Sequence, residues 1–235
     1  MKSVFFGSIG AVAETSEFQR RAYNQALKEA GLDWAWSAAT YRQLLRTVGG
    51  KARLRMLSGA TGAGLSDDLI NQIHRRKTEL ACAAIVAAGV PLRPGVADLA
   101  RQVKAAGAAL GFVTSTYQEN IDAIFNLGDD GFSRSDMDVV IGRADVDEGK
   151  PAPDVYLAAL KATGLSPDDV IAIEDSPSSA RAATLAGLKV VITPGAYCDP
   201  LIGDEADLIL TALAEENGQV SPLLHRALGG PSVAA

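Results

Sequence analysis

The chain has 235 residues, of which 48% are hydrophobic and 21% charged, and its formal net charge is −6. This composition is typical of a water-soluble globular protein that is long enough for one sizeable domain and a smaller insertion. The acidic balance, without a dense Lys/Arg block, excludes nucleic-acid binding through bulk charge, and no apolar run reaches the roughly 18–20 residues that span a bilayer. With only two cysteines, Cys82 and Cys198, the sequence predicts a cytoplasmic protein without a disulfide framework.

The chain begins with a strand-like run over residues 2–6, and the patterns that follow up to residue 91 are helical. The spacing of apolar residues predicts helices at 15–30, 41–46, 51–57 and 66–88, with a loose loop over 58–64. After Gly95, short apolar runs alternate with amphipathic stretches. The later predicted strands are 110–113, 139–141, 170–173, 189–192 and 208–210, and the helices between them are 118–126, 153–163 and 178–186.

Short apolar strands that alternate with helices indicate an α/β fold, with a doubly wound, Rossmann-like parallel sheet that is buried on both faces. One strand, then a wholly helical block, then the remaining strands indicates a small α-helical cap domain inserted after strand one. We therefore expect an α/β core over residues 1–15 and 92–228, a helical cap over 16–91 and a disordered tail over 229–235.

Ligands of open α/β sheets bind beyond the carboxyl ends of the strands. Glu174 and Asp175 directly follow a buried strand, where two carboxylates are costly unless they pair with a cation, although Asp175 or Ser176 could instead cap the next helix. Thr114 ends another strand and could hold a phosphate oxygen or cap a helix. Lys150 lies in a Gly-Lys-Pro-Ala-Pro-Asp loop, where a lone lysine is usually solvated. Together, the two carboxylates, Thr114 and Lys150 indicate a ligand site more specifically than any one of them does alone.

This order of motifs resembles the haloacid dehalogenase superfamily of phosphohydrolases, and the helical block after strand one resembles subfamily I. Shorter segments resemble the CbbY-like sugar-phosphate phosphatases and the β-phosphoglucomutases. They are Gly49-Gly50-Lys51, the run from His74 to Glu79, Arg93-Pro94-Gly95-Val96, and Thr114-Ser115-Thr116 with Asn120. The resemblance spans residues 2–210. It implies that the partner is phosphate or a small phosphorylated metabolite, with no nucleic acid and no membrane, and it leaves any protein partner unknown.

The resemblance also implies roles for individual residues. The implied substrate contacts are Thr114, Ser115 and Lys150 in the core and Lys51, Arg53 and Lys77 in the cap. Thr114 and Lys150 are in addition the implied catalytic residues, because they would hold and neutralise the transferring phosphoryl group. Glu174 and Asp175 would ligate Mg²⁺.

One departure from the family pattern concerns catalysis. Relatives carry Asp-x-Asp after the first strand, where the first Asp attacks phosphorus and the second is the general acid/base; here Gly7 and Ile9 stand at those positions. Loss of a covalent nucleophile costs on the order of 10⁴–10⁶ in rate. Mg²⁺ also loses a ligand, so we expect its binding to be weakened. Ser8 lies between the two positions, and strand alternation predicts that it points the other way.

We therefore expect a catalytically impaired relative that retains a phosphate or sugar-phosphate site. Without the two carboxylates, Lys150 should lack its usual partner, and an anion should be repelled less. Two alternatives remain open: an active Mg²⁺-dependent phosphatase that uses another nucleophile or direct water attack, and a non-catalytic interaction protein. A buried Lys150–Asp175 ion pair with no room for an anion would favour the interaction protein.

Overall fold

The computed structural model describes residues 1–128, 132–198 and 206–229. Its core is a six-stranded parallel sheet with the strand order β3-β2-β1-β4-β5-β6. The strands are β1 (Ser3–Phe6), β2 (Leu110–Val113), β3 (Val139–Ile141), β4 (Val170–Glu174), β5 (Lys189–Ile192) and β6 (Leu208–Ile209). This order is that of a doubly wound, Rossmann-like sheet, so the predicted fold class is confirmed.

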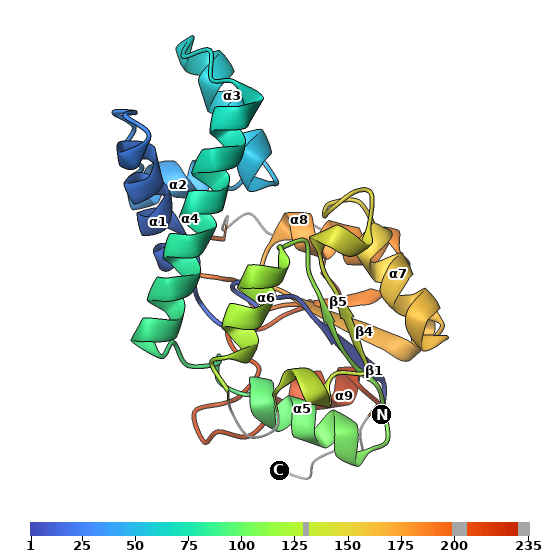
Figure 1. The fold of residues 1–235 in the computed structure, drawn as a ribbon. Coiled ribbons are helices and arrows are strands. Elements are labelled where there is room, and N and C mark those ends of the chain that lie inside the picture. Colours follow the sequence, from blue (N-terminus) through green and yellow to red (C-terminus); the bar gives the residue numbers. More distant parts are fainter. Residues whose placement is uncertain (129–131, 199–205, 230–235) are drawn as a thin grey trace.

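Helices cover both faces of the sheet (Figure 1). One face carries α5 (Val96–Ala105), α6 (Gln118–Phe125) and α9 (Pro222–Ala227), and the other carries α7 (Asp154–Thr163) and α8 (Pro177–Leu185). Short 3₁₀ helices lie at Arg134–Asp136, Arg143–Asp145 and Pro167–Asp169. Successive strand residues point to opposite faces of the sheet. In β1, Val4 and Phe6 therefore pack in the apolar cluster on the side of α5, α6 and α9, and Phe5 packs in the cluster on the side of α7 and α8.

Four helices stand together on one side of the sheet (Figure 1). They are α1 (Ser16–Glu29), α2 (Ala38–Leu44), α3 (Gly50–Thr61) and α4 (Asp67–Ala88), and we call them the cap. The cap has its own apolar cluster, which includes Tyr23, Trp36 and Leu54. Helix α4 packs along α1 and also against α6 of the core. Within the described residues, no helix is both long and apolar enough to cross a membrane.

Four segments differ from the sequence expectation or fall outside the description. The helices α5 and α9 were not predicted, although Val96, Leu99 and Val103 recur at helical spacing. Helix α3 continues to Thr61, where a loop was predicted, and it ends at Gly62 because glycine readily adopts the left-handed φ of +67° found there. The predicted tail over 229–235 lies, apart from its first residue, outside the described residues.

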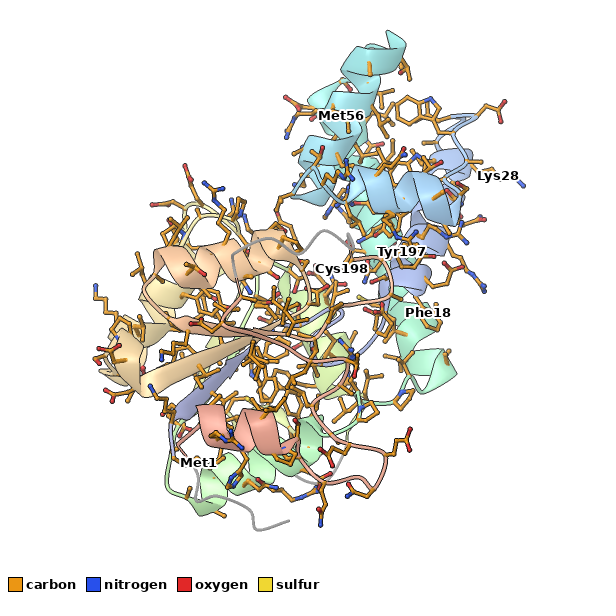
Figure 2. The ribbon with its side chains drawn as sticks, turned by 180° about the vertical axis from the view of Figure 1, so that it is seen from behind. Met1, Phe18, Lys28, Met56, Tyr197 and Cys198 are labelled. Carbon is orange, nitrogen blue, oxygen red and sulfur yellow. The ribbon has the colours of Figure 1, made fainter. Side chains whose placement is uncertain are left out.

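The loop after β5 connects the core to the cap. Arg93 holds the start of this loop, since its guanidinium donates to the carbonyl oxygens of Thr193 at 2.7 Å and Gly10. Farther along, the hydroxyl of Tyr197 donates to Glu17 of α1, and Arg42 of α2 donates to Ala196 O at 3.3 Å. Figure 2 shows Tyr197 beside the cap helices. The loop therefore bridges the sheet edge and the cap.

Candidate functional site

The carboxyl ends of four adjacent strands form the candidate site. Gly7 follows β1, Thr114 follows β2 and Asp175 follows β4, while Lys150 follows β3 by way of the 3₁₀ helix Arg143–Asp145. The four strands are parallel neighbours, so their ends meet at one edge of the sheet.

Lys150 is buried at this edge, with 8% of its surface exposed. Its Nζ donates to Val113 O at 2.8 Å and forms an ion pair with Oε1 of Glu174, and the hydroxyl of Tyr156 donates to the same carboxylate oxygen. Burial, followed by the charge of Glu174, raises the pKa of Tyr156 well above its ordinary value, so the phenol stays a donor. The expectation that Lys150 lacks a carboxylate partner is therefore wrong, and the partner is Glu174 rather than Asp175.

Glu174 can pair with Lys150 in this way because it uses the space beside Gly7. A Cβ atom added at Gly7 would overlap Oε2 of Glu174 and lie 2.8 Å from its Cδ atom. Asp175 crowds Gly10 in the same manner, since a Cβ atom there would lie 2.8 Å from Asp175 Cγ, and the φ of +79° favours glycine as well. The carboxylates after β4 thus occupy the volume in which a side chain at residue 7 would lie.

Hydroxyl groups line the β1 and β2 ends of the edge. Ser8 and Thr114 share a hydrogen bond of 2.7 Å between their hydroxyl oxygens, and Thr116 N donates to Thr114 Oγ1 at 3.1 Å. Ser8 therefore faces Thr114 instead of pointing away, because the strand ends at Phe6 and its alternation goes no farther. Ser115 accepts from Lys150 N at 2.7 Å, which fixes the backbone of the lysine loop.

The magnesium ligands that the resemblance implies are engaged elsewhere or poorly ionised. Glu174 is bound by Lys150 and Tyr156. Burial, followed by the charges of Glu174 and Glu14, raises the pKa of Asp175 to about 7, so its carboxyl is partly protonated at neutral pH. Within the described ranges, no group of three Asp, Glu, His or Cys side chains could hold a metal ion. The residues present do not fit Mg²⁺, which commonly binds through one or two free carboxylates.

A cavity of about 400 Å³ lies where α3 and α4 of the cap meet the start of α6. Its lining residues are Lys51, Asn71, His74, Arg75, Thr78, Glu79, Tyr117 and Glu119. Lys51 Nζ lies 5.6 Å from the ring centroid of Tyr117, which directly precedes α6. Burial, followed by the charge of Lys77, lowers the pKa of His74 to about 3, so this imidazole is neutral. Lys51 is thus the predicted cap residue that lines a cavity shared with the core.

The other two predicted cap cations are buried. Lys77 Nζ lies 4.8 Å from the ring centroid of Tyr23, and burial followed by the charge of Arg53 lowers the pKa of Lys77 to about 7. Arg53 donates from Nε to Leu44 O at 2.9 Å, and its guanidinium lies over the rings of Tyr23 and Tyr41. Arg53 thus holds the interior of the cap together.

Two polar residues, one before α1 and one in its first turn, were not predicted from the sequence as site residues. Thr15 Oγ1 and Gln19 Oε1 are buried, and neither atom has a hydrogen-bond partner among the described residues. The amide nitrogen of Gln19 donates to Asn120 Oδ1 of α6 at 3.1 Å, so Gln19 lies between cap and core. The spacing of four residues from Gln19 to Tyr23 places Gln19 on the buried face of α1 and was the available signal.

Hydroxyl groups and Lys150 line the edge, and among the described residues the positions after β1 carry no carboxylate at residues 7 and 9. Gly7 has no side chain, and Ile9 packs against the apolar core of the sheet. Within the described part of the chain, no carboxylate or imidazole is hydrogen-bonded to the hydroxyl of Ser8 or Thr114 as a base. A serine hydroxyl is a weak nucleophile without such a base.

Comparisons with known proteins agree with this fold. A model of the haloacid dehalogenase-like hydrolases matches residues 4–187. Protein CbbY of Rhodobacter capsulatus is 40% identical over 197 residues, which cover 84% of this chain and 87% of the relative. Plasmid-encoded CbbY of Cupriavidus necator is 37% identical over 222 residues, covering 92% of this chain and 87% of the relative.

Solved structures give the same relationship. The crystal structure of CbbY from Rhodobacter sphaeroides in complex with phosphate is 35% identical with a TM-score of 0.82, covering 93% of this chain and 98% of that one. A mutant of the same protein in complex with xylulose-(1,5)bisphosphate gives 34% identity and a TM-score of 0.81 over the same shares. The parallel sheet, the cap and these similarities place the chain in the family of haloacid dehalogenase-like hydrolases, related to CbbY.

Proposed function

We propose that this chain binds phosphate or a small sugar phosphate in the cytoplasm and does not hydrolyse it. The observation that carries the proposal is the loop after β1, where Gly7 and Ile9 stand at the positions of the family's nucleophile and acid/base. Glu174 fills the space beside Gly7 but is tied to Lys150 and Tyr156, so it is not available to attack phosphorus.

Unsatisfied polar groups and cations support an anionic, hydroxylated ligand. Buried polar atoms in proteins almost always have a hydrogen-bond partner, so the orphaned oxygens of Thr15 and Gln19 call for a donor from a ligand or water. Lys51 supplies positive charge from the cap, and the hydroxyl of Thr114 can donate to a phosphate oxygen at the sheet edge. These groups would hold a phosphorylated sugar between core and cap.

The ligands in solved structures of CbbY support a phosphorylated ligand for this chain. Structures of CbbY contain phosphate in one case and a sugar bisphosphate in another. For this chain we infer a ligand with one phosphate at Thr114 and Lys150 and a second phosphate or hydroxyl near Lys51.

A non-catalytic interaction protein is the second candidate, and the buried Lys150–Glu174 pair favours it. This pair resembles the Lys150–Asp175 pair that would favour such a protein, because Lys150 already has a counter-ion without any ligand. The two candidates differ in whether the site takes up an anion.

Isothermal titration with inorganic phosphate and with xylulose-1,5-bisphosphate tests the proposal. We expect both to bind, and we expect Lys51→Met to weaken the bisphosphate by about 10-fold or more, because a charge-assisted hydrogen bond is worth about 1.5–3 kcal/mol. The matched control is Lys28→Met, which removes a lysine on the exposed side of α1 and should leave binding unchanged. Absence of heat with both ligands would favour the interaction protein.

A further inference from the structure

We propose that Glu174 has become the fixed counter-ion of Lys150, so that this site takes up its anion without a divalent cation. The counter-ion role of Glu174 is independent of the proposed function. The metal-independent uptake of an anion rests on the proposed function. The residues of this chain do not fit the magnesium site that its family resemblance implies.

One carboxylate oxygen of Glu174 is engaged by the pair, and the other lies beside Gly7. Oε1 accepts from Lys150 Nζ and from the hydroxyl of Tyr156, and Oε2 fills the space in which a Cβ atom of residue 7 would lie. Glu174 is 1% exposed and Lys150 8% exposed, so water screens the pair very little. The glycine at position 7 is what gives the carboxylate this room.

A divalent cation at Oε2 of Glu174 would share a carboxylate whose charge Lys150 already neutralises, and one at Oε1 would have to displace Lys150. Lys150 would then be left buried with only Val113 O and the hydroxyl of Tyr156 as acceptors, and an uncompensated buried charge is strongly unfavourable. Asp175 alone remains at the end of β4, and it is already packed against Gly10 and Gly195. The geometry therefore disfavours a metal at this edge.

The charge balance makes a metal unnecessary for anion binding. A cation is needed beside a phosphate when carboxylates of the site repel it. Here residues 7 and 9 carry no charge, and Glu174 is neutralised by Lys150. The repulsion that a metal would cancel is thus reduced to that from Asp175.

The test measures thermal stability in EDTA and in about 10 mM MgCl₂ or MnCl₂, where a site with a Kd of about 0.1 mM would raise the melting temperature clearly by mass action. We expect no rise for the natural protein. Glu174→Gln should lower its melting temperature by several degrees in EDTA, since Lys150 loses its counter-ion without any metal being present. Lys150→Met should restore part of this loss in the double variant, because it removes the unpaired charge.

Asp175→Asn is the matched control, since it neutralises the adjacent carboxyl without touching Lys150, and it should not reproduce the coupling with Lys150→Met. If Glu174→Gln does not fold, Tyr156→Phe removes one donor to the same oxygen and should lower the melting temperature in EDTA to a smaller extent. A rise with Mg²⁺ that Glu174→Gln abolishes, or additive effects of Glu174→Gln and Lys150→Met, would overturn the counter-ion role.

Titration of inorganic phosphate in EDTA and in MgCl₂ separates this inference from the proposed function. Equal affinities within about twofold support metal-independent uptake, and affinity that appears only with MgCl₂ contradicts it. Absence of phosphate binding in both buffers would contradict the proposed function, and with it metal-independent uptake, while leaving the Lys150–Glu174 pairing to be decided by the melting temperatures.

Discussion

Lys77 shows how burial alters a single functional group in this protein. Burial is the first cause that lowers its pKa to about 7, the charge of Arg53 is the second, and Cys82 acts in the opposite direction. The ring of Tyr23 faces the ammonium group, and His74 nearby is neutral. Lys77 is therefore partly deprotonated near pH 7.5, and an anion that binds beside it should bring a proton onto it.

We predict that binding of xylulose-1,5-bisphosphate, whose second phosphate we place near Lys51, takes up as much as about one proton at pH 8, measured by titration calorimetry in buffers of different ionisation enthalpy. Lys77→Met should abolish the part of the uptake that is not due to phosphate itself, whereas Lys28→Met should retain it. Equal uptake by the natural protein and the Lys77→Met variant would show that Lys77 does not sense the anion.

The same lysine has a consequence for stability. Its folded pKa of about 7 lies below the ordinary value of 10.5, so between these two values the unfolded chain binds more protons and this group makes stability rise with pH. The contribution of Lys77 is therefore least favourable below pH 7. Urea unfolding at pH 7 and pH 9 should show a smaller pH dependence in Lys77→Met than in the natural protein.

At the residue scale, the sequence predicts which residues lie at the site better than it predicts which residues they contact. Lys150, Thr114 and the Glu174-Asp175 pair lie at one sheet edge, as strand-end motifs indicate. Which carboxylate pairs with Lys150 depends on side-chain length and on the space beside Gly7, and neither can be read from spacing. The orientation of Ser8 was missed because the residue at which β1 ends decides it.

Among the elements, the loop after β5 contacts two cap helices, α1 and α2. The hydroxyl of Tyr197 donates to Glu17, and its ring packs edge-on against Tyr41 at 5.4 Å between centroids. The guanidinium of Arg42 in α2 also lies over the Tyr197 ring, 5.8 Å from its centroid. The cap is thus held to the core by α4 on α6 and by this loop.

We predict that Tyr197→Ala costs about 1–2 kcal/mol and that Tyr197→Phe costs less, because the second variant keeps the ring contacts. Hydrogen exchange should become faster in α1 and α2 of the Tyr197→Ala variant, while the strands stay protected. Unchanged exchange in both helices would mean that the loop does not hold the cap.

The sequence predicts the strands and the longer helices because each has a clear period and a marked end. Helix α5 was not predicted, although its apolar spacing begins directly after the turn at Pro94-Gly95. The bridge between Tyr197 and Glu17 joins residues 180 positions apart, so no local pattern could indicate it.

On the scale of the whole molecule, the charge is unevenly distributed. The chain carries a net charge of −6, yet Lys150 lies at the carboxyl ends of the core strands and Lys51 lines the cavity between cap and core. Only local contacts can then favour an anion, because the field of the whole protein opposes its approach. This distribution suits retention of a phosphorylated ligand that the cap and core both contact.

The central claim is binding without turnover, and ³¹P nuclear magnetic resonance of xylulose-1,5-bisphosphate mixed with the natural protein tests both parts at once. With MgCl₂ or EDTA, we predict that the ligand resonances shift or broaden and that no inorganic phosphate signal grows over several hours. Growth of that signal in the natural protein, faster than in a Lys150→Ala sample, would contradict the account and identify an active phosphatase.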